Sequence, residues 1–346
     1  MNRIKIVSRS PHLSGVISGF LMLREQGLLD FKIDLVYEQS NLYPHLALVE
    51  AEIEGVKIAF DVKDGYNFDA EKVDAYLRTV DFYFKRSFSE EKNAALVAPE
   101  NRQKMHPLGF NYHLSYPGNP LDRFSFRDFK LSAWQILKPL IGRKHQRYFT
   151  PEVFEAPADY KEDAPEIIFL TRLWPLTEET VGLHDYINET RIAIIRELSK
   201  KYGEKFTGGV SDSALSRALC PDLILPKSVT VREKYLPLMK RSDICIGSMG
   251  LRESIGWKTG EYIAASRAIV HERFHYSVPG DFTIGKHYFD FDTVDECVTH
   301  VDYLYQNQDA LFAMKQANQE YYQEWLRPDK QVLNALETAL DKKPGD

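Results

Sequence analysis

The sequence predicts an α/β fold made of two domains. The chain has 346 residues, which is enough for two domains of ordinary size. Short apolar stretches that are typical of buried strands alternate with segments of helical periodicity. This alternation occupies residues 1–116, is interrupted over residues 117–164, and resumes over residues 165–308. We therefore expect one α/β domain on each side of an interdomain segment.

The first domain begins with a unit typical of Rossmann-like folds. Residues 4–7 are an apolar strand, the loop that follows contains His12, and residues 16–26 have helical periodicity that ends at Gly27. Further strands are expected at residues 33–37 and 80–84. Residues 47–53 and 56–62, joined at Glu54-Gly55, are expected to form a hairpin.

The interdomain segment, residues 117–164, has a different composition. Residues 124–149 are rich in aromatic and basic side chains and are expected to form one or two helices. One interpretation is a packed linker whose apolar side faces the two domains, which is the commoner use of a short amphipathic stretch. The other is a surface that contacts a membrane or an acceptor, because basic residues accompany the apolar ones.

The second domain is expected to contain a parallel sheet with helices on both faces. Strands are expected at residues 167–170, 205–210, 222–225, 243–246 and 268–271, with helices at residues 188–202 and 231–241. Further helices are expected near residues 294–305 and at residues 309–326.

Composition excludes several classes of protein. The chain is 44% hydrophobic and 27% charged, as globular proteins are, and its net charge of −6 argues against a nucleic-acid partner. Three cysteines form no C-x-x-C pair, so neither a zinc site nor a disulfide framework is indicated. No signal-peptide pattern and no run of 18 apolar residues is present, and the expected location is therefore the cytoplasm.

The stretch at residues 236–272 is the most informative part of the chain. A strand at residues 243–246 leads into a loop of small residues, a helix start, an alanine-rich helix and a second strand. Such a loop binds anions, because free backbone N–H groups and the helix dipole both point into it. Glu253 and Glu261 lie here with seven residues between them, and Gly256 follows the first by three.

This spacing resembles the E-x7-E signature of retaining nucleotide-sugar glycosyltransferases of the GT-B fold, the group 1 or family 4-like enzymes. Their usual form is E-G-F-G-L-x-x-x-E, and here the sequence is ESIGWKTGE followed by YIAASRAIV. The resemblance is strongest over residues 165–330. It implies two Rossmann-like domains with a cleft between them. It also implies C-terminal helices, residues 309–346, that cross back to pack on the first domain.

The resemblance also implies roles for individual residues in binding a nucleotide-diphosphate sugar. Arg172, in LTRLWP, matches the arginine of a G-R-L-x-x-x-K string that grips the pyrophosphate, whereas the lysine of that string is missing and Lys258 is the candidate replacement. Glu261 would accept hydrogen bonds from the ribose hydroxyls, and Glu253 would orient the donor sugar. The loop expected to present backbone N–H groups to phosphate contains Gly250, Ser254, Ile255, Gly256 and Trp257.

The first domain is expected to contact the acceptor. His12 occupies the loop where inverting GT-B enzymes often place a general base, with His106 and His113 as rivals. Two interpretations of Lys85 and Arg86, at a strand end, stay open. One is binding of an anionic acceptor, and the other is ordinary solvation at the surface. No clear D-x-D motif is present, so metal-independent transfer without a cofactor is expected.

The expected function is therefore transfer of a sugar from a nucleotide-diphosphate sugar to a hydroxyl of a glycan, a lipid-linked or another glycoconjugate acceptor. This activity would serve surface polysaccharide or glycoconjugate synthesis, with peripheral contact at the inner face of a membrane as an open question. Retention of configuration is favoured. The alternatives are an inverting enzyme with His12 as base, a nucleotide-sugar 2-epimerase, and a non-catalytic protein that binds nucleotide or glycan.

Overall fold

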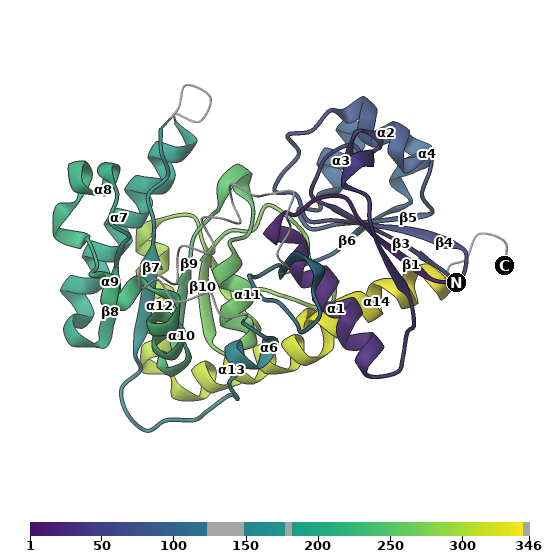
Figure 1. The fold of residues 1–346 in the computed structure, drawn as a ribbon. Helices are drawn as coiled ribbons and strands as arrows, with labels where there is room; N and C mark the ends of the chain where they lie inside the picture. Colours follow the sequence, from purple (N-terminus) through teal and green to yellow (C-terminus); the bar gives the residue numbers. More distant parts are fainter. Residues whose placement is uncertain (123–148, 177–181, 342–346) are drawn as a thin grey trace, which may run out of the picture.

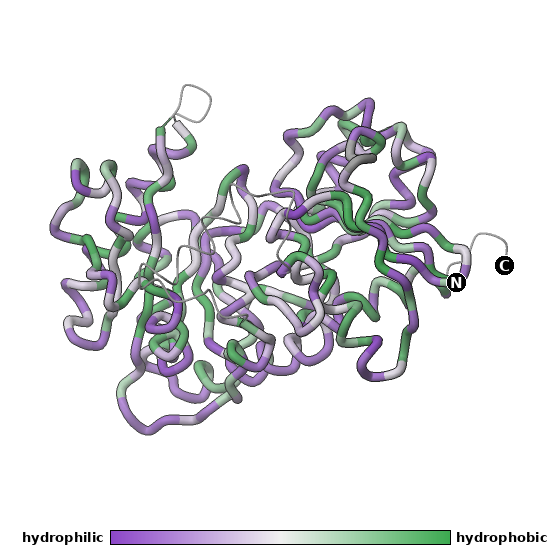
Figure 2. The backbone as a smooth tube through the Cα atoms, in the orientation of Figure 1, coloured by the Kyte–Doolittle hydropathy of each residue, from purple (hydrophilic) through white to green (hydrophobic). Residues whose placement is uncertain are grey.

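The computed structural model describes residues 1–122, 149–176 and 182–341, with the backbone alone described at residues 38–40. Figure 1 shows two α/β lobes, each built around one sheet. The sheets use residues 3–107 and residues 167–291. Hydrophobic stretches run through the inner strands of both sheets, and hydrophilic residues predominate on the outer loops (Figure 2). In the described part of the chain, every helix is too short or too polar to cross a membrane.

The N-terminal sheet has six strands in the order β2-β1-β3-β4-β5-β6. β3 is antiparallel to β1 and β4, and the other neighbours are parallel. The expected hairpin is β3 and β4, and its turn residues Glu54 and Gly55 both have positive φ, as a type I′ turn requires. The strands are β1 (Arg3–Ile6), β2 (Lys32–Leu35), β3 (Leu48–Ile53), β4 (Val56–Asp61), β5 (Phe82–Lys85) and β6 (Met105–Pro107).

Short helices follow the strands of this sheet. The buried helix α1 begins directly after the 3₁₀ turn η1 that carries His12, and it packs against both the sheet and the C-terminal helix. The helices are η1 (Pro11–Leu13), α1 (Ser14–Glu25), η2 (Tyr37–Leu42), α2 (Ala70–Leu77), α3 (Glu90–Leu96), α4 (Pro99–Arg102) and η3 (Pro120–Asp122).

The C-terminal sheet has five parallel strands in the order β11-β10-β9-β7-β8. The strand order reverses between β7 and β9, and such a switch point is where α/β sheets bind ligands. The strand expected at residues 222–225 is absent: Pro221 begins a 3₁₀ turn, and only Ile224 bridges to Val210. The strands are β7 (Ile167–Thr171), β8 (Phe206–Val210), β9 (Ile244–Gly247), β10 (Ala268–Glu272) and β11 (Phe289–Phe291).

Helices cover both faces of this sheet, as the alternation predicts. They are α6 (Pro151–Phe154), α7 (Leu183–Tyr202), η5 (Gly203–Lys205), α8 (Ala214–Leu219), η6 (Pro221–Leu223), α9 (Lys227–Thr230), α10 (Arg232–Arg241), η7 (Leu251–Glu253), α11 (Trp257–Ala264), α12 (Val294–Gln306), α13 (Gln308–Tyr321), η8 (Tyr322–Leu326) and α14 (Pro328–Asp341).

The chain crosses back to the N-terminal domain at α14. α13 stays with the second domain, where Met314 is part of the core, and the π-helical turn η8 leads to Pro328. α14 then packs on α1 so closely that a Cβ on Gly19 would lie 2.2 Å from the Pro328 carbonyl oxygen. The return expected from residue 309 onward is therefore made by residues 328–341. Two α/β domains joined by a returning helix confirm the GT-B class of fold.

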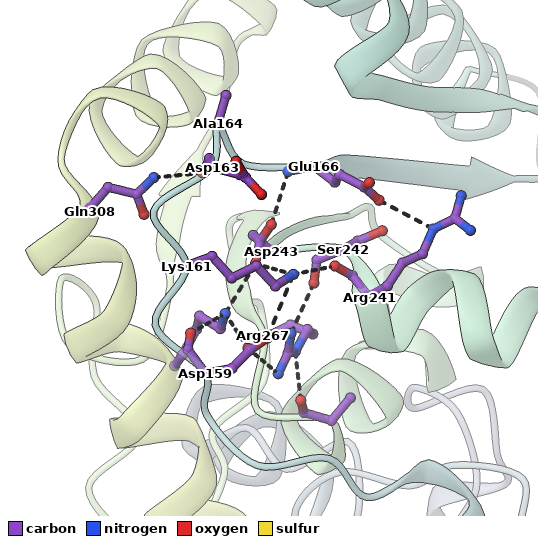
Figure 3. A network of polar contacts seen from close by, with 12 residues as sticks. Asp159, Lys161, Asp163, Ala164, Glu166, Arg241, Ser242, Asp243, Arg267 and Gln308 are labelled. Carbon is purple, nitrogen blue, oxygen red and sulfur yellow. Dashed lines mark hydrogen bonds and ion pairs between the residues drawn. The ribbon is translucent and has the colours of Figure 1, made fainter.

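A cluster of charged residues attaches the end of the interdomain segment to the second domain (Figure 3). Lys315 and Lys161 both reach Asp243 Oδ1, at 3.1 and 2.9 Å. Arg267 and Lys315 also pair with Asp159, at 3.0 and 2.5 Å. These contacts fix residues 156–166 against the second domain. The aromatic and basic stretch on which the two interpretations of this segment depend lies almost entirely outside the described residues.

Candidate functional site

A cavity of about 650 Å³ lies between the two domains. Its walls come from the carboxyl ends of β7 and β9, from the start of α11, and from three side chains of the N-terminal domain. The predicted donor-site residues and His12 line this cavity, whereas Glu253 and the rival histidines His106 and His113 do not. The predicted residues that line it are His12, Arg172, Gly250, Ser254, Ile255, Gly256, Trp257, Lys258 and Glu261.

Arg191 of α7 organises the strand ends that form the floor of the cavity. Its Nε donates to Ser248 Oγ at 2.9 Å and its Nη2 to the Met249 carbonyl at 2.7 Å, while Nη1 donates to the Arg172 carbonyl. The side chain is 4% exposed, and burial lowers its pKa to about 10, so it stays charged at neutral pH. Arg191 therefore ties the end of β7 to the end of β9 at the switch point.

Arg172 and Lys258 bring positive charge into the cavity without a carboxylate partner. The Arg172 guanidinium lies 4.0 Å from the centre of the Trp174 ring, and Lys258 Nζ lies 4.0 Å from that of Tyr235. Neither side chain makes an ion pair within the described part of the chain. Burial lowers the pKa of Lys258 to about 8, so its amine is mostly protonated at pH 7.

The helix α11 begins at this cavity with free backbone N–H groups. Its N-cap residue is Gly256, which has no side chain to accept from them. The preceding loop is tightened by hydrogen bonds from Gly250 N to Ser254 O at 2.7 Å and from Ser254 N to Leu251 O at 3.1 Å. A free helix N-terminus next to unpaired cations is a favourable place for an anion.

Glu261 is 2% exposed and lines the same cavity. Its Oε1 accepts from Arg232 Nη2 at 2.8 Å, whereas Oε2 has no hydrogen-bond partner in the described structure. Arg232 and Tyr235 lie three residues apart on α10 and therefore face the same side, toward Glu261. A buried carboxylate oxygen without a donor is suited to accept hydrogen bonds from a ligand.

Trp257 connects the two domains beside the helix start. Its ring meets His12 edge-on with centroids 4.6 Å apart and stacks on His113 at 5.4 Å. Burial lowers the pKa of both histidines, so both are neutral at pH 7. His106 instead stacks on Phe82 between β5 and β6, away from the cavity.

Arg86 also joins the domains at the cavity wall. Its guanidinium pairs with Asp64 and donates from Nη2 to the Ile255 carbonyl at 2.5 Å. Asp64 and Arg86 both line the cavity. Lys85, by contrast, is completely buried and pairs with Asp61 at 2.9 Å, so it is neither a solvated surface residue nor open to an acceptor.

Glu253 lies outside the cavity. Arg252 and Glu253 both have positive φ, at 57° and 62°, and this turn directs the Glu253 carboxylate to Lys92 of the N-terminal domain at 2.7 Å. The hydrogen bond from Lys92 lowers the pKa of Glu253. In this structure the predicted sugar-orienting residue is part of an interdomain ion pair.

Charge in the cavity is strongly positive although the whole chain is acidic. The lining cations are Arg86, Arg172, Arg191, Arg232 and Lys258. Only Asp64 and Glu261 oppose them, and each already has an arginine partner. Among the described residues, no group of three or more His, Cys, Asp or Glu is arranged to hold a metal ion. An anion is therefore the ligand that this charge distribution favours.

Sequence reasoning did not find Arg191, Arg232 or Asp64 as lining residues of this site, whereas it named Arg86 as a candidate for binding an anionic acceptor. Arg191 and Arg232 lie inside ordinary amphipathic helices, and Asp64 lies in a loop that the strand pattern does not orient. In the sequence, each of these residues is a charged residue near a predicted strand end or helix start. Many surface residues fit that description, so it does not single out a site.

No family model and no curated protein matches the chain. Solved structures that it is similar to include HepE of Anabaena in complex with UDP and glucose, at 11% identity over 79% of this chain and 68% of HepE, with a TM-score of 0.41. A putative UDP-N-acetylglucosamine 2-epimerase of Listeria monocytogenes is 10% identical over 98% of this chain and 96% of the epimerase, with a TM-score of 0.39. The C-terminal domain of a group 1 glycosyl transferase of Francisella tularensis is 11% identical over 50% of this chain and 95% of that domain, with a TM-score of 0.34.

Proposed function

We propose that the cleft binds a nucleotide-diphosphate sugar and transfers its sugar to an acceptor hydroxyl. The observation that carries this proposal is the composition of one cavity. Two cations without carboxylate partners and a free helix N-terminus stand beside a buried carboxylate with one free oxygen. A diphosphate needs the first two features and a ribose needs the third.

The proposed donor site assigns each group a task. Arg172, Lys258 and the first N–H groups of α11 bind the diphosphate, and Glu261 Oε2 accepts from the ribose hydroxyls. As the bond to the sugar breaks, negative charge grows on the leaving diphosphate, and cations fixed in place stabilise that charge. Protein side chains would thus supply the positive charge for transfer without a metal ion.

The stereochemical course has two candidates. The E-x7-E resemblance favours retention. Inversion with His12 as general base is favoured by a specific observation: neutral His12 lines the same cavity as Lys258 and Glu261, whereas Glu253 does not line it. Proton NMR of the first product formed decides between them, because the anomeric coupling constant differs between retained and inverted products.

The acceptor is defined here only by its reacting group, a hydroxyl. A hydroxyl of a glycan, a lipid-linked sugar or another glycoconjugate would approach from the N-terminal side, where His12 and Asp64 line the cavity. Synthesis of a surface polysaccharide or glycoconjugate is the process that such a reaction would serve.

Thermal unfolding with a panel of nucleoside diphosphates and nucleotide sugars tests the donor site. A ligand at 100 times its Kd adds about 2.7 kcal/mol to the free energy of unfolding. We expect one nucleotide to stabilise the wild type and Glu261→Ala to lose that stabilisation. If the whole panel leaves the melting temperature unchanged, the proposal is wrong. Conversion of the sugar donor to its epimer without an acceptor would instead identify an epimerase.

A further inference from the structure

Arg232 holds the proposed ribose-binding carboxylate from outside the E-x7-E stretch. It is the first residue of α10, and its side chain is 24% exposed. Nη2 donates both to Glu261 Oε1 at 2.8 Å and to the His113 carbonyl at 3.0 Å. The first contact lies within the C-terminal domain, and the second reaches the segment by which the chain leaves the N-terminal domain.

Two aromatic rings fix the plane of this guanidinium. The Arg232 Cζ lies 5.0 Å from the ring centre of Phe149 and 5.1 Å from that of Phe154. A planar cation held over aromatic rings and bound to two oxygens has little freedom to rotate. Arg232 is therefore a rigid support, and its direction determines how the Glu261 carboxylate is turned.

The two oxygens of the Glu261 carboxylate therefore have different roles. Oε1 is occupied by Arg232, and Oε2 stays buried without a partner. A carboxylate oxygen accepts hydrogen bonds and donates none. Without Arg232, Lys258 and Tyr235 would remain as neighbours of Glu261, and Arg232 would no longer fix the direction of its carboxylate.

From this geometry we propose that Arg232 is the positioning residue for ribose recognition: it holds Glu261 so that Oε2 faces the 2′ and 3′ hydroxyls of the nucleotide. This inference rests on the proposed function, because it requires that a nucleotide occupies the cavity. It adds a residue that determines whether a ribonucleotide is distinguished from its 2′,3′-dideoxy counterpart.

Isothermal titration calorimetry tests this role with two ligands per variant. The probes are the tightest-binding of ADP, GDP, CDP and UDP and the 2′,3′-dideoxy form of the same nucleotide. In the wild type, we expect loss of the hydroxyls to weaken binding at least about 10-fold, as for hydrogen bonds to a charged group. In Arg232→Gln, we expect that ratio to fall below about 3-fold while the dideoxy nucleotide binds within about 3-fold of its wild-type affinity.

Four further variants sharpen the result. Arg232→Lys keeps a cation and should restore part of the ratio, and Lys234→Gln, an exposed position on the same helix, should leave it unchanged. Glu261→Gln should also lose the ratio, and Arg232→Gln added to it should have no further effect. Thermal unfolding of each variant without ligand verifies that it is folded.

Three outcomes overturn the inference. If Arg232→Gln weakens both nucleotides equally and keeps the ratio, Arg232 contacts the nucleotide elsewhere and does not position Glu261. If the wild type binds a nucleotide without discriminating against the dideoxy form, Glu261 does not contact ribose, although the donor site itself would stand. Failure of the wild type to bind any of the four nucleotides would overturn the proposed function together with this inference.

Discussion

Charged residues lie at both ends of the C-terminal sheet. Those at the amino ends of the strands are ion-paired, whereas two cations at the carboxyl ends have no carboxylate partner among the described residues. At the amino ends of the strands, Asp243 precedes β9 and Arg267 precedes β10, and both belong to the network of polar contacts in Figure 3. Lys315 pairs with Asp243 in the same network. At the carboxyl ends, Arg172 follows β7, and Lys258 lies just inside α11. Neither has a carboxylate partner among the described residues.

This difference separates charges that hold the fold together from charges that await a ligand. A buried cation costs folding free energy unless an anion and hydrogen bonds compensate for its lost hydration. In the amino-end network, protein carboxylates provide that compensation. In the cleft, buried Lys258 has no such carboxylate among the described residues, so the bound ligand is expected to supply the compensation. Loss of a charged residue that is ion-paired within the protein should therefore affect stability. Loss of a charged residue without such a partner should affect ligand binding.

The largest expected effect is on stability, from Asp243→Ala. Asp243 is 2% exposed, accepts from Lys315 and Lys161, and also receives the Glu166 backbone N–H at 3.0 Å. Removing it leaves buried Lys315 with Asp159 as its remaining carboxylate among the described residues and leaves the Glu166 N–H without that acceptor, which should lower the free energy of unfolding by about 3–5 kcal/mol. Urea unfolding followed by circular dichroism measures this change.

Asp222→Asn is the matched control for that experiment. Asp222 pairs with Arg196 at 3.4 Å on the exposed surface, so its loss should cost less than about 1 kcal/mol. Equal effects of the two substitutions would show that the network in Figure 3 does not stabilise the fold in the way argued above.

The fold could be predicted from the sequence, and so could the part of the cleft that α11 and the neighbouring strand ends form. Apolar runs and glycine stops reflect burial within single elements, so they located β1, the β3–β4 hairpin, β7 and β9. Lys258 and Glu261 lie on one helix next to a strand end, and Arg172 ends the neighbouring strand, so topology alone brings them together.

The rest depended on tertiary packing and on backbone conformation. Arg191 and Arg232 come from helices whose orientation over the sheet the sequence pattern does not specify. Glu253 illustrates the limit most clearly. Its direction is set by a left-handed turn at Arg252 and Glu253 and by Lys92 on the other domain, and neither is encoded in the E-x7-E spacing.

A smaller effect on stability but a clear effect on binding is expected from Lys258→Met. The amine has no carboxylate partner, so its removal should leave the free energy of unfolding unchanged or raise it. Nucleotide affinity should fall about 10- to 100-fold, since a charged contact to the diphosphate is lost. Calorimetric titration and urea unfolding of one preparation measure both, and a large loss of stability with intact binding would reverse the assignment.

The pH dependence of Lys258 gives the same variant a second signature. Burial lowers the pKa of its amine to about 8, with Glu261 favouring and Arg232 and Arg191 opposing the charged form. Nucleotide affinity should therefore fall as pH rises through 8, because the cation is lost. The unfolded chain binds that proton more tightly than the folded chain, so this residue's contribution to stability becomes more favourable from about pH 8 toward 10.5. Both trends should disappear in Lys258→Met.

The smallest effects are expected at the interdomain ion pair of Glu253 and Lys92. Both side chains are about one-third exposed, so Glu253→Gln and Lys92→Gln should each lower the free energy of unfolding by less than about 1 kcal/mol. Nucleotide affinity should stay within about 3-fold of wild type in both, because neither residue lines the cavity.

Transfer rates of the two variants separate an effect of the ion pair from a direct contact between Glu253 and the sugar. If Glu253 acts only through Lys92, both substitutions change the transfer rate equally, and the double variant is no worse than either. A loss of transfer in Glu253→Gln alone would mean that the carboxylate leaves Lys92 and reaches the sugar when the donor is bound, as the E-x7-E resemblance implies.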